Sequence, residues 1–211
     1  MLSGAYAKKQ ISAEDPVFSA PFYVPYEAAL AAGLSILEAA RAAMPLDVLT
    51  LSSRLKSGAS IRGKLQRKQL PQTSAAAGAA LRDIAGLRAV LTTRDAVYRY
   101  AGLLSQTLDL EDIHDYIAAP KPSGYRSLHM IIEVPIFLSK EKRYMRVEVQ
   151  LRTIAMDFWA SLEHKLHYKN DISQEYAQEI AQQLCDCAQI VSETDQKMLA
   201  IRRQIEGEYD L

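Results

Sequence analysis

The chain has 211 residues, of which 49% are hydrophobic and 24% are charged, so it can bury a sizeable core and is not globally disordered. Its formal net charge is zero, and bulk charge therefore does not favour duplex nucleic acid as a partner. The two cysteines, Cys185 and Cys187, are too close for good disulfide geometry in a helix, which favours a reducing, cytoplasmic setting. No apolar run approaches the roughly 18 residues of a membrane span, so we expect neither a span nor a signal peptide.

The N-terminal half is expected to contain mainly helices. Residues 1–24 are polar and interrupted by prolines, which predicts a loose arm. A helix is expected over 26–43, where Leu30, Leu34 and Leu37 recur at helical spacing. The segments that follow are extended at 47–56, helical at 58–69, and a loop or weak helix start at 71–79.

The second half has the pattern of a sheet followed by helices. Expected strands are 84–92, 112–118, 128–136 and 143–152, the last two forming an antiparallel hairpin, and expected helices are 94–106, 153–169 and 173–206. In the 153–169 helix, one stripe carries Ile154, Phe158, Leu162 and Leu166. The order of elements predicts an α+β domain with a mixed sheet flanked by helices.

The strand at 143–152 has one apolar and one polar face, because side chains alternate along a strand. The apolar face has Val147, Val149 and Leu151, and the polar face has Arg146, Glu148, Gln150 and Arg152. The polar residues fit the solvent face of an edge strand. They also fit a functional wall, in which the Glu148 carboxylate acts as a base or a metal ligand. The strand alone does not decide between these readings.

A basic cluster occupies residues 53–68. Arg54 and Lys56 share a side if that piece is extended, and Ser60, Lys64 and Arg67 share a side if theirs is helical. Guanidinium and ammonium groups in such a cluster can bind a polyphosphate. A solvated basic helix face is the alternative, and charge patterning does not separate the two.

Two further groups flank the predicted strands. Asp83 precedes a buried strand that carries Arg88; it either caps a turn or, if it faces Glu148, helps to hold Mg²⁺. The segment APKPSGYRSLH at 119–129 offers the cation of Lys121, a stacking ring at Tyr125 and a donor at His129. Each of these is an ordinary turn residue on its own, and the combination indicates a nucleotide-binding loop.

Two apparent metal motifs are not expected to bind metal. His114 and Asp115 form the dipeptide of metal phosphohydrolases, but no histidine precedes position 114 to complete such a site. His164 and His167 are three residues apart, a spacing that can bind zinc, but they lack the H-E-x-x-H order and nearby ligands.

Four segments together resemble the synthetase domain of RelA/SpoT-type alarmone synthetases, in its small single-domain form. They are R-x-K-x-x-x-S-x-x-x-K at 54–64, RDIAGLR at 82–88, DYIAAPKPSGYRSLH at 115–129 and VEVQLRTIAMDFWASLEHKLHYK at 147–169, and they occur in the family's order. The resemblance implies a sheet of about five strands in a nucleotidyltransferase-like fold. It also implies a GTP pyrophosphokinase, which moves the β,γ-diphosphate of ATP to the 3′-hydroxyl of GDP or GTP and releases AMP.

The resemblance assigns roles to individual residues. For ATP, Arg54 and Arg88 would sandwich the adenine, and the phosphates would contact Lys56, Ser60, Lys64 and Arg67. Asp83 would bind Mg²⁺, and Glu148 would activate the 3′-hydroxyl as a base or share the metal. For the acceptor, Tyr125 would stack on guanine, Lys121 and His129 would contact phosphates, and Gln150 would line the same wall. Asp157 would lie near the guanine, at a position where relatives carry Asn.

The resemblance also implies an assembly and a division of the chain. We expect a homotetramer built through the C-terminal helix, with an arm at 1–24, a synthetase domain at 25–172 and an oligomerisation helix at 173–211. Small relatives often carry lysines in the first helix that help to bind an activating alarmone between subunits; 26–43 has a single basic residue, Arg41, which leaves such activation open. For the synthetase itself, GMP is a further acceptor to consider beside GDP and GTP. The alternatives are a toxic relative that uses adenosine nucleotides or the tRNA 3′ end, and a non-catalytic regulator that binds nucleotide or single-stranded RNA.

Overall fold

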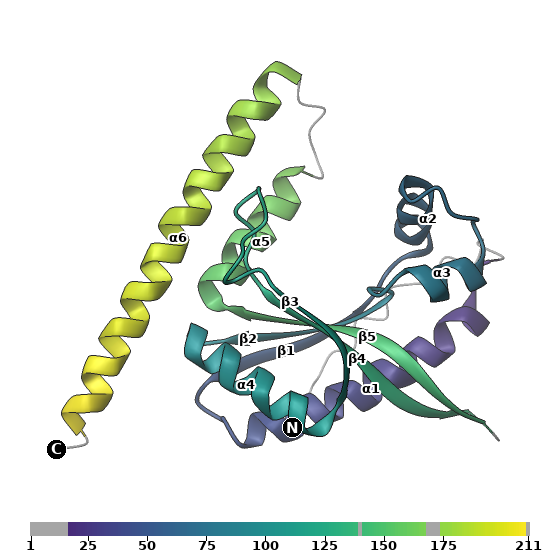
Figure 1. Cartoon of the computed structure of the whole chain (residues 1–211), viewed down its shortest axis with the longest axis horizontal. Helices are drawn as coiled ribbons and strands as arrows, with labels where there is room; N and C mark the ends of the chain where they lie inside the picture. The colour runs from purple at the N-terminus through teal and green to yellow at the C-terminus, as the bar shows by residue number, and fades with distance from the viewer. Residues whose placement is uncertain (1–16, 139–140, 168–173, 210–211) are drawn as a thin grey trace, which may run out of the picture.

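The computed structural model describes residues 17–138, 141–167 and 174–209, and the N-terminal arm expected over 1–24 lies largely outside them. In the described residues, five strands form one mixed sheet in the order β1-β2-β5-β4-β3 (Figure 1). The strands are β1 (Val48–Leu55), β2 (Ala85–Leu91), β3 (Asp109–Asp115), β4 (Leu128–Leu138) and β5 (Glu141–Thr153). β2 and β5 are parallel, and the other neighbours are antiparallel. The predicted α+β class and the β4–β5 pairing are confirmed.

β5 lies at the centre of the sheet, paired to β2 on one side and β4 on the other. The edge-strand reading of its polar face is therefore wrong. Gln150 and Arg152 on that face are buried, and so are Val147 and Val149 on the opposite one. The predicted alternation of β5 is correct, but both of its faces are covered.

Two helices cover the apolar face of the sheet. α1 (Ala20–Ala42) and α4 (Arg94–Thr107) lie together on this side (Figure 1). α1 approaches closely at Gly33, where an added Cβ would lie 2.9 Å from Leu87 Cδ1. α1 begins at Ala20, six residues before the predicted start at 26, because the aromatic side chains of Phe18 and Tyr23 are buried in the core. The end of the expected loose arm is thus part of the packed fold.

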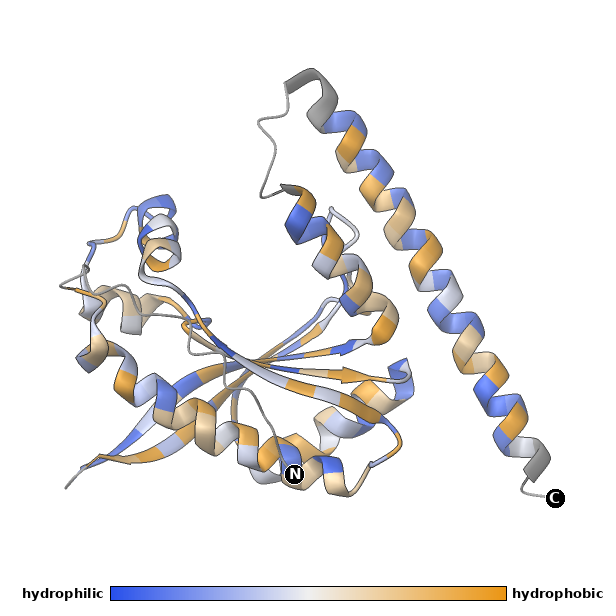
Figure 2. Ribbon diagram, turned by 180° about the vertical axis from the view of Figure 1, so that it is seen from behind, coloured by the Kyte–Doolittle hydropathy of each residue, from blue (hydrophilic) through white to orange (hydrophobic). Residues whose placement is uncertain are grey.

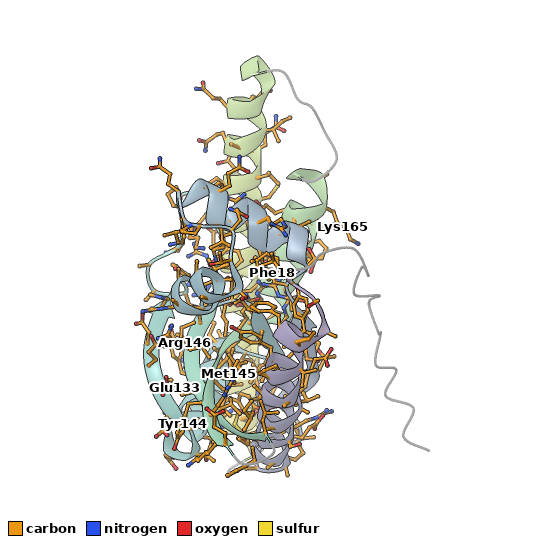
Figure 3. All side chains as sticks on the ribbon, turned by 90° about the vertical axis from the view of Figure 1, so that its right-hand side faces the viewer. Phe18, Glu133, Tyr144, Met145, Arg146 and Lys165 are labelled. Carbon is orange, nitrogen blue, oxygen red and sulfur yellow. The ribbon has the colours of Figure 1, made fainter. Side chains whose placement is uncertain are left out.

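Three helices stand on the opposite, polar face. α2 (Gly58–Arg67) and α3 (Ser74–Ala80) lie at one end of it, and α5 (Ile154–His167) lies at the other (Figure 1). In Figure 3, Lys165 of α5 is far from Tyr144 and Glu133, which mark the outer part of the β4–β5 hairpin. The segment 71–79, expected as a loop or weak helix start, contains α3, which begins after a Thr73 side-chain cap.

The C-terminal helix α6 (Gln174–Tyr209) packs against α5 and α4. Between its grey ends, apolar and polar residues alternate along α6 in Figure 2. Its last turns are tied to the fold where Arg202 Nη1 donates to Asp47 at the start of β1. In the described part of the chain, no helix combines the length and the apolar character that crossing a membrane requires.

Two predicted elements differ in detail from the structure. The strand expected at 112–118 runs from Asp109 to Asp115, because the Asp115 carboxylate accepts hydrogen bonds from the backbone N–H groups of Ile117 and Ala118 and turns the chain. The predicted stripe of α5 is not its core face, since its members are 44–58% exposed: Ile154, Phe158, Leu162 and Leu166. Met156 and Trp159 are buried instead.

Candidate active site

A cleft with a cavity volume of about 630 Å³ opens on the polar face of the sheet, between α2 and α5. Residues from β1, α2, β2, β4 and β5 line it together with the 116–125 segment and α5. The largest polar groups of this lining are Arg54, Lys64, Arg82, Asp83, Arg88, His114, Tyr116, Lys121, Tyr125, His129, Glu148, Gln150, Arg152, Glu163, His164 and Lys165. The cleft therefore combines many cations with a few carboxylates.

The floor of the cleft is set by strand register. Gly86 pairs with both Arg54 and Glu148, and this row of the sheet brings Arg54 Nη2 to 3.9 Å from Glu148 Oε2. Gly86 leaves room for this arrangement, because an added Cβ would lie 3.3 Å from Arg54 Nε. In the next row, Gln150 lies between Arg88 and His129. Cross-strand pairing therefore places the arginines and the carboxylate on one face.

Asp83 lies in an ion pair with two lysines on one side of the cleft. Its carboxylate oxygens are each 2.9 Å from an ammonium group, Oδ2 from Lys56 Nζ and Oδ1 from Lys64 Nζ. Burial raises the pKa of this carboxyl, but hydrogen bonds from the two ammonium groups outweigh burial and lower the pKa to about 2. Asp83 is therefore ionised at neutral pH and pairs with two cations, Lys56 just before α2 and Lys64 on α2.

Glu148 belongs to a closed ring of hydrogen bonds. One carboxylate oxygen is 3.0 Å from His129 Nδ1, and the other accepts from Gln150 Nε2 at 2.7 Å. Tyr125 Oη lies 2.8 Å from His129 Nε2, and Arg152 Nη2 donates to both Tyr125 Oη and Gln150 Oε1. When His129 donates from Nδ1 to Glu148 and accepts a hydrogen bond from Tyr125 Oη at Nε2, every bond in the ring has a donor and an acceptor.

The ring fixes the charge state and direction of the Glu148 carboxylate. Burial raises its pKa and so does the charge of Asp83, whereas the hydrogen bonds from His129 and Gln150 lower it, and the net result is a lowered pKa. Glu148 is thus ionised at neutral pH and held by neighbours on β4 and β5. An ionised carboxylate held in a fixed direction can accept a hydrogen bond from a bound hydroxyl, which is the geometry that a general base requires.

The segment 119–127, which we call the acceptor loop, turns tightly before β4. Gly124 has φ +86°, and the turn is closed by hydrogen bonds between the backbones of Lys121 and its neighbours at 124 and 125. The Lys121 ammonium lies 4.5 Å from the ring centroid of Tyr116 and 5.1 Å from that of Tyr125. A base that stacks on Tyr125 from this side must displace Lys121.

Asp157 at the start of α5 joins the two sides of the cleft. Its Oδ1 accepts from Arg88 Nη1 at 3.1 Å and from Arg152 Nη1 at 2.9 Å. Arg88 was assigned to the donor nucleotide and Asp157 to the acceptor, so the structure links residues predicted for different nucleotides.

The comparisons with known proteins agree on one family. The sequence model described as "Region found in RelA / SpoT proteins" matches residues 53–173, which is more than half of the chain. This chain belongs to the RelA/SpoT family. It is 42% identical over 156 residues to GTP pyrophosphokinase YwaC of Bacillus subtilis (73% of each chain), and 34% identical over 164 residues to GTP pyrophosphokinase YjbM of the same organism (77% of this chain, 74% of the relative).

Solved structures of small RelA/SpoT-family synthetases have the same fold. Small alarmone synthetase 1 from B. subtilis bound to its product pppGpp superimposes with a TM-score of 0.79 at 31% identity, over 88% of this chain and 96% of that one. Small alarmone synthetase 2 from the same organism gives 0.76 at 37% identity, over 85% and 95%. The family and the single-domain form inferred from the sequence are confirmed.

Most residues predicted for the site of this RelA/SpoT-family chain meet in the cleft. Its lining contains Arg54, Lys64, Asp83, Arg88, Lys121, Tyr125, His129, Glu148 and Gln150. Lys56 is outside the lining but forms an ion pair with the lining residue Asp83. Asp157 is likewise outside the lining and forms ion pairs with Arg88 and Arg152, which line the cleft. Ser60 and Arg67 are exposed on α2 outside the lining, so their contact with ATP phosphates stays a prediction. Both ring nitrogens of His129 are engaged within the protein, so a contact with acceptor phosphates would require the ring of bonds to open.

The sequence-based assignment missed several residues of the cleft. Arg152 was recognised on the polar face of β5 but given no role, although its two-residue spacing from Gln150 was the available signal. Tyr116 adds a second aromatic ring beside Tyr125, with centroids 6.1 Å apart. On α5, Ser161, His164 and Lys165 lie at helical spacing and together face the cleft.

The carboxylates of the cleft are compatible with Mg²⁺. Among the described residues, no group of three or more His, Cys, Asp or Glu side chains could hold a metal by itself. Asp83 and Glu148 both line the cleft, and the Asp83 charge raises the pKa of Glu148. Mg²⁺ is typically held by one or two carboxylates together with substrate phosphates, so this pair fits Mg²⁺ that arrives with a nucleotide.

Proposed function

We propose that this chain is a GTP pyrophosphokinase that moves the β,γ-diphosphate of ATP to the 3′-hydroxyl of GDP or GTP, which yields ppGpp or pppGpp and AMP. The observation that carries the proposal is the position of Glu148, held by the hydrogen-bonded ring between a basic donor side and an aromatic acceptor loop. The similarity to the two B. subtilis GTP pyrophosphokinases supports it.

The donor side provides cations for a triphosphate. Arg54 and Arg88 present guanidinium groups that can stack on an adenine, and Lys64 faces the cleft beside Asp83. Lys56 completes this cluster through Asp83, and Ser60 and Arg67 on α2 would come into contact with the phosphates if α2 moves toward the cleft. Phosphoryl transfer depends mainly on positioning and on neutralising charge, which this set of side chains supplies.

The acceptor side provides a ring and a base. Tyr125 offers a face for guanine, Lys121 leaves that face to pair with acceptor phosphates, and Asp157 offers carboxylate oxygen to the guanine edge. Glu148 takes the proton of the 3′-hydroxyl while the hydroxyl oxygen bonds to the β-phosphorus of ATP. The bond between that phosphorus and the α,β-bridging oxygen breaks, and AMP leaves with the bridging oxygen. Gln150 and His129 hold the carboxylate in line during this step.

Mg²⁺ is the proposed cofactor, held by Asp83 and by substrate phosphates, with Glu148 as a further oxygen ligand or as the base alone. When bound, it would neutralise phosphate charge at the transferring group. Release of Asp83 from Lys56 and Lys64 would then leave both ammonium groups available to the phosphates.

A homotetramer is the proposed assembly, with the C-terminal helix at the interface. Large apolar side chains that are exposed in the single chain support this assembly, because subunit contacts would bury them. On α5 they include Phe158 and Leu166, and on α6 they include Ile190, Met198, Ile201 and Ile205. The nucleotide substrates and the free thiols of Cys185 and Cys187 favour a cytoplasmic location. Binding of single-stranded RNA stays a prediction.

The test is an acceptor panel. Purified protein is incubated with Mg²⁺ and γ-labelled ATP and offered GMP, GDP, GTP, ADP, ATP or deacylated tRNA, and the labelled products are separated. Label in guanosine tetra- or pentaphosphate is the expected result. Label only in adenosine products or tRNA would overturn the choice of acceptor, and no transfer to any acceptor would overturn the enzymatic proposal.

A further inference from the structure

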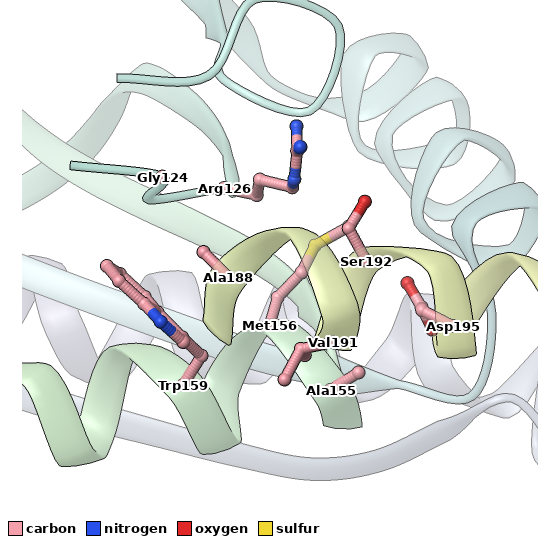
Figure 4. A pocket seen from close by; sticks show the side chains of 9 residues that line it. All are labelled: Gly124, Arg126, Ala155, Met156, Trp159, Ala188, Val191, Ser192 and Asp195. Atoms are coloured by element: carbon pink, nitrogen blue, oxygen red, sulfur yellow. The ribbon is translucent and has the colours of Figure 1, made fainter. Parts of the chain in front are cut away.

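The acceptor loop lies directly on the C-terminal helix α6. A Cβ added to Gly124 would lie 2.4 Å from the Ala188 Cβ and 3.5 Å from the Cys185 Cα. The backbone of the turn therefore packs directly against α6, with no side chain larger than a methyl group between them. Figure 4 shows Gly124 and Ala188 facing one another across this junction. Only a small residue at each position permits this approach.

The same contact supports the ring of Tyr125. Ala188 forms a buried apolar cluster with Trp159 and Ala160 of α5, and the Tyr125 ring packs against this cluster beside Leu184. Trp159 Nε1 donates to the Leu184 carbonyl at 3.0 Å, which fixes α5 and α6 relative to each other. The position of the Tyr125 ring is therefore set partly by α6.

α6 is also bonded to the end of the central strand. Asp195 is buried and accepts from Thr153 Oγ1 at 3.0 Å and from Arg94 Nε at 3.3 Å. Arg94 Nη2 donates further to the Ser192 hydroxyl at 2.6 Å. Thr153 ends β5, the strand that carries Glu148, so α6 is held at a fixed position relative to the proposed base.

We propose that α6 positions the acceptor nucleotide. Ala188 is the positioning residue: its small side chain sets how closely the Gly124 turn and the Tyr125 ring lie against α6. This inference rests on the proposed assignment of the acceptor loop to GDP or GTP. The donor-side residues Arg54 and Lys64 lie on β1 and α2, whereas α6 packs on α5 and α4. A local displacement of the Gly124 turn by the residue at 188 therefore changes the affinity for the acceptor and leaves Arg54 and Lys64 in place for ATP.

The experiment compares Ala188→Leu with wild type in the full chain. A larger side chain at 188 pushes the Gly124 turn away, and we expect the KM for the guanosine acceptor to rise at least tenfold, with the KM for ATP within twofold. Ala181→Leu is the matched control, because Ala181 lies two turns earlier on the same face of α6 and is exposed. Its two KM values should equal those of wild type.

Ala188→Gly is the second variant, because Ala188→Leu could prevent folding. It removes the methyl group under the turn, and we expect a smaller rise of about threefold in the acceptor KM, without a change in the KM for ATP. Equal changes in the two KM values, or an unchanged acceptor KM in variants that melt cooperatively, would overturn the inference.

A binding measurement separates this inference from the proposed function. The dissociation constants of a fluorescent GDP analogue and a fluorescent ATP analogue are measured for each variant without turnover. If wild type transfers no label but Ala188→Leu selectively weakens the GDP analogue, the positioning role stands and the proposed reaction fails. If wild type is active and neither the KM nor the dissociation constant moves, the positioning role alone fails. If wild type binds no GDP analogue, both fail.

Discussion

Arg152 lines the cleft, and its conservative replacement provides a sharp test of the hydrogen-bonded ring. Its guanidinium is buried and donates to Tyr125 Oη at 2.7 Å, Gln150 Oε1 at 3.0 Å and Asp157 Oδ1 at 2.9 Å. Lysine would keep the charge but cannot reproduce these bonds, because its donors are gathered on one nitrogen.

The magnitude follows from the number of bonds lost. Lysine can replace one of the three, so Arg152→Lys loses two bonds from a charged donor, each worth about 1.5–3 kcal/mol. Water in the open cleft replaces part of this, which leaves a net loss of about 2–3 kcal/mol. Since about 1.4 kcal/mol corresponds to a factor of ten, kcat/KM for the acceptor should fall about 30- to 100-fold.

The assay is steady-state transfer at saturating ATP with a varied guanosine acceptor. Arg143→Lys is the matched control, because Arg143 lies on the same strand but is exposed and pairs with Glu141 outside the cleft. The KM for ATP should change by less than about threefold in Arg152→Lys, since Asp157 still pairs with Arg88. An acceptor kcat/KM within twofold of wild type, in a variant with native thermal stability, would refute the role given to Arg152.

Two further changes test the floor of the cleft and the anchor of α6. In Gly86→Ala the new methyl group crowds Arg54, so the KM for ATP should rise about three- to tenfold. The control Gly102→Ala adds a methyl group in open space on α4 and should leave this KM unchanged. An equal KM for ATP in the two variants would contradict the packing argument. Burial raises the pKa of Asp47, but bonds from Arg202 and Thr92 lower it overall, so its stabilisation is complete above about pH 4 and is lost as pH falls through the lower folded-state pKa. Asp47→Asn should therefore lower Tm by about 5 °C at pH 7 and by progressively less as pH falls below about 4 and through the folded-state pKa, as thermal melts would measure. A difference in Tm that does not shrink as the pH falls through this range would contradict the argument.

Local sequence patterns predicted the elements well where the relevant forces are local. The two-residue alternation of β5 placed Val147, Val149 and Leu151 on the apolar face, and all three are buried. Helical spacing predicted α2 and α4, which also have side-chain caps at Ser57 and Thr93. Each of these signals depends on neighbouring residues alone.

Features that depend on distant pairing could not be predicted from local pattern. The central place of β5 results from its parallel pairing with β2, about sixty residues earlier in the chain. The exposed stripe with Phe158 looks like a core face because periodicity reports which residues share a side and not what covers that side. The role of Arg152 needs partners from the acceptor loop and α5, and no spacing within β5 contains them.

The site residues came mainly from the family motifs, and the structure adds how they are connected. His129 was assigned to phosphates, but its contacts lie with Glu148 and Tyr125. Asp157 was placed near guanine, and its contacts also extend to Arg88. Hydrogen-bond partners depend on side-chain direction in three dimensions, which a linear motif does not encode.

The most direct test of the account is a single-turnover comparison of wild type with Glu148→Gln, using γ-labelled ATP and GDP or GTP at saturating concentrations. We expect labelled guanosine tetra- or pentaphosphate from wild type. We also expect transfer slower by about 10²- to 10⁴-fold in the variant, which is the usual contribution of a general base, with both nucleotide dissociation constants within about threefold of wild type. Transfer at a near wild-type rate by Glu148→Gln would contradict the central claim that this carboxylate activates the acceptor hydroxyl.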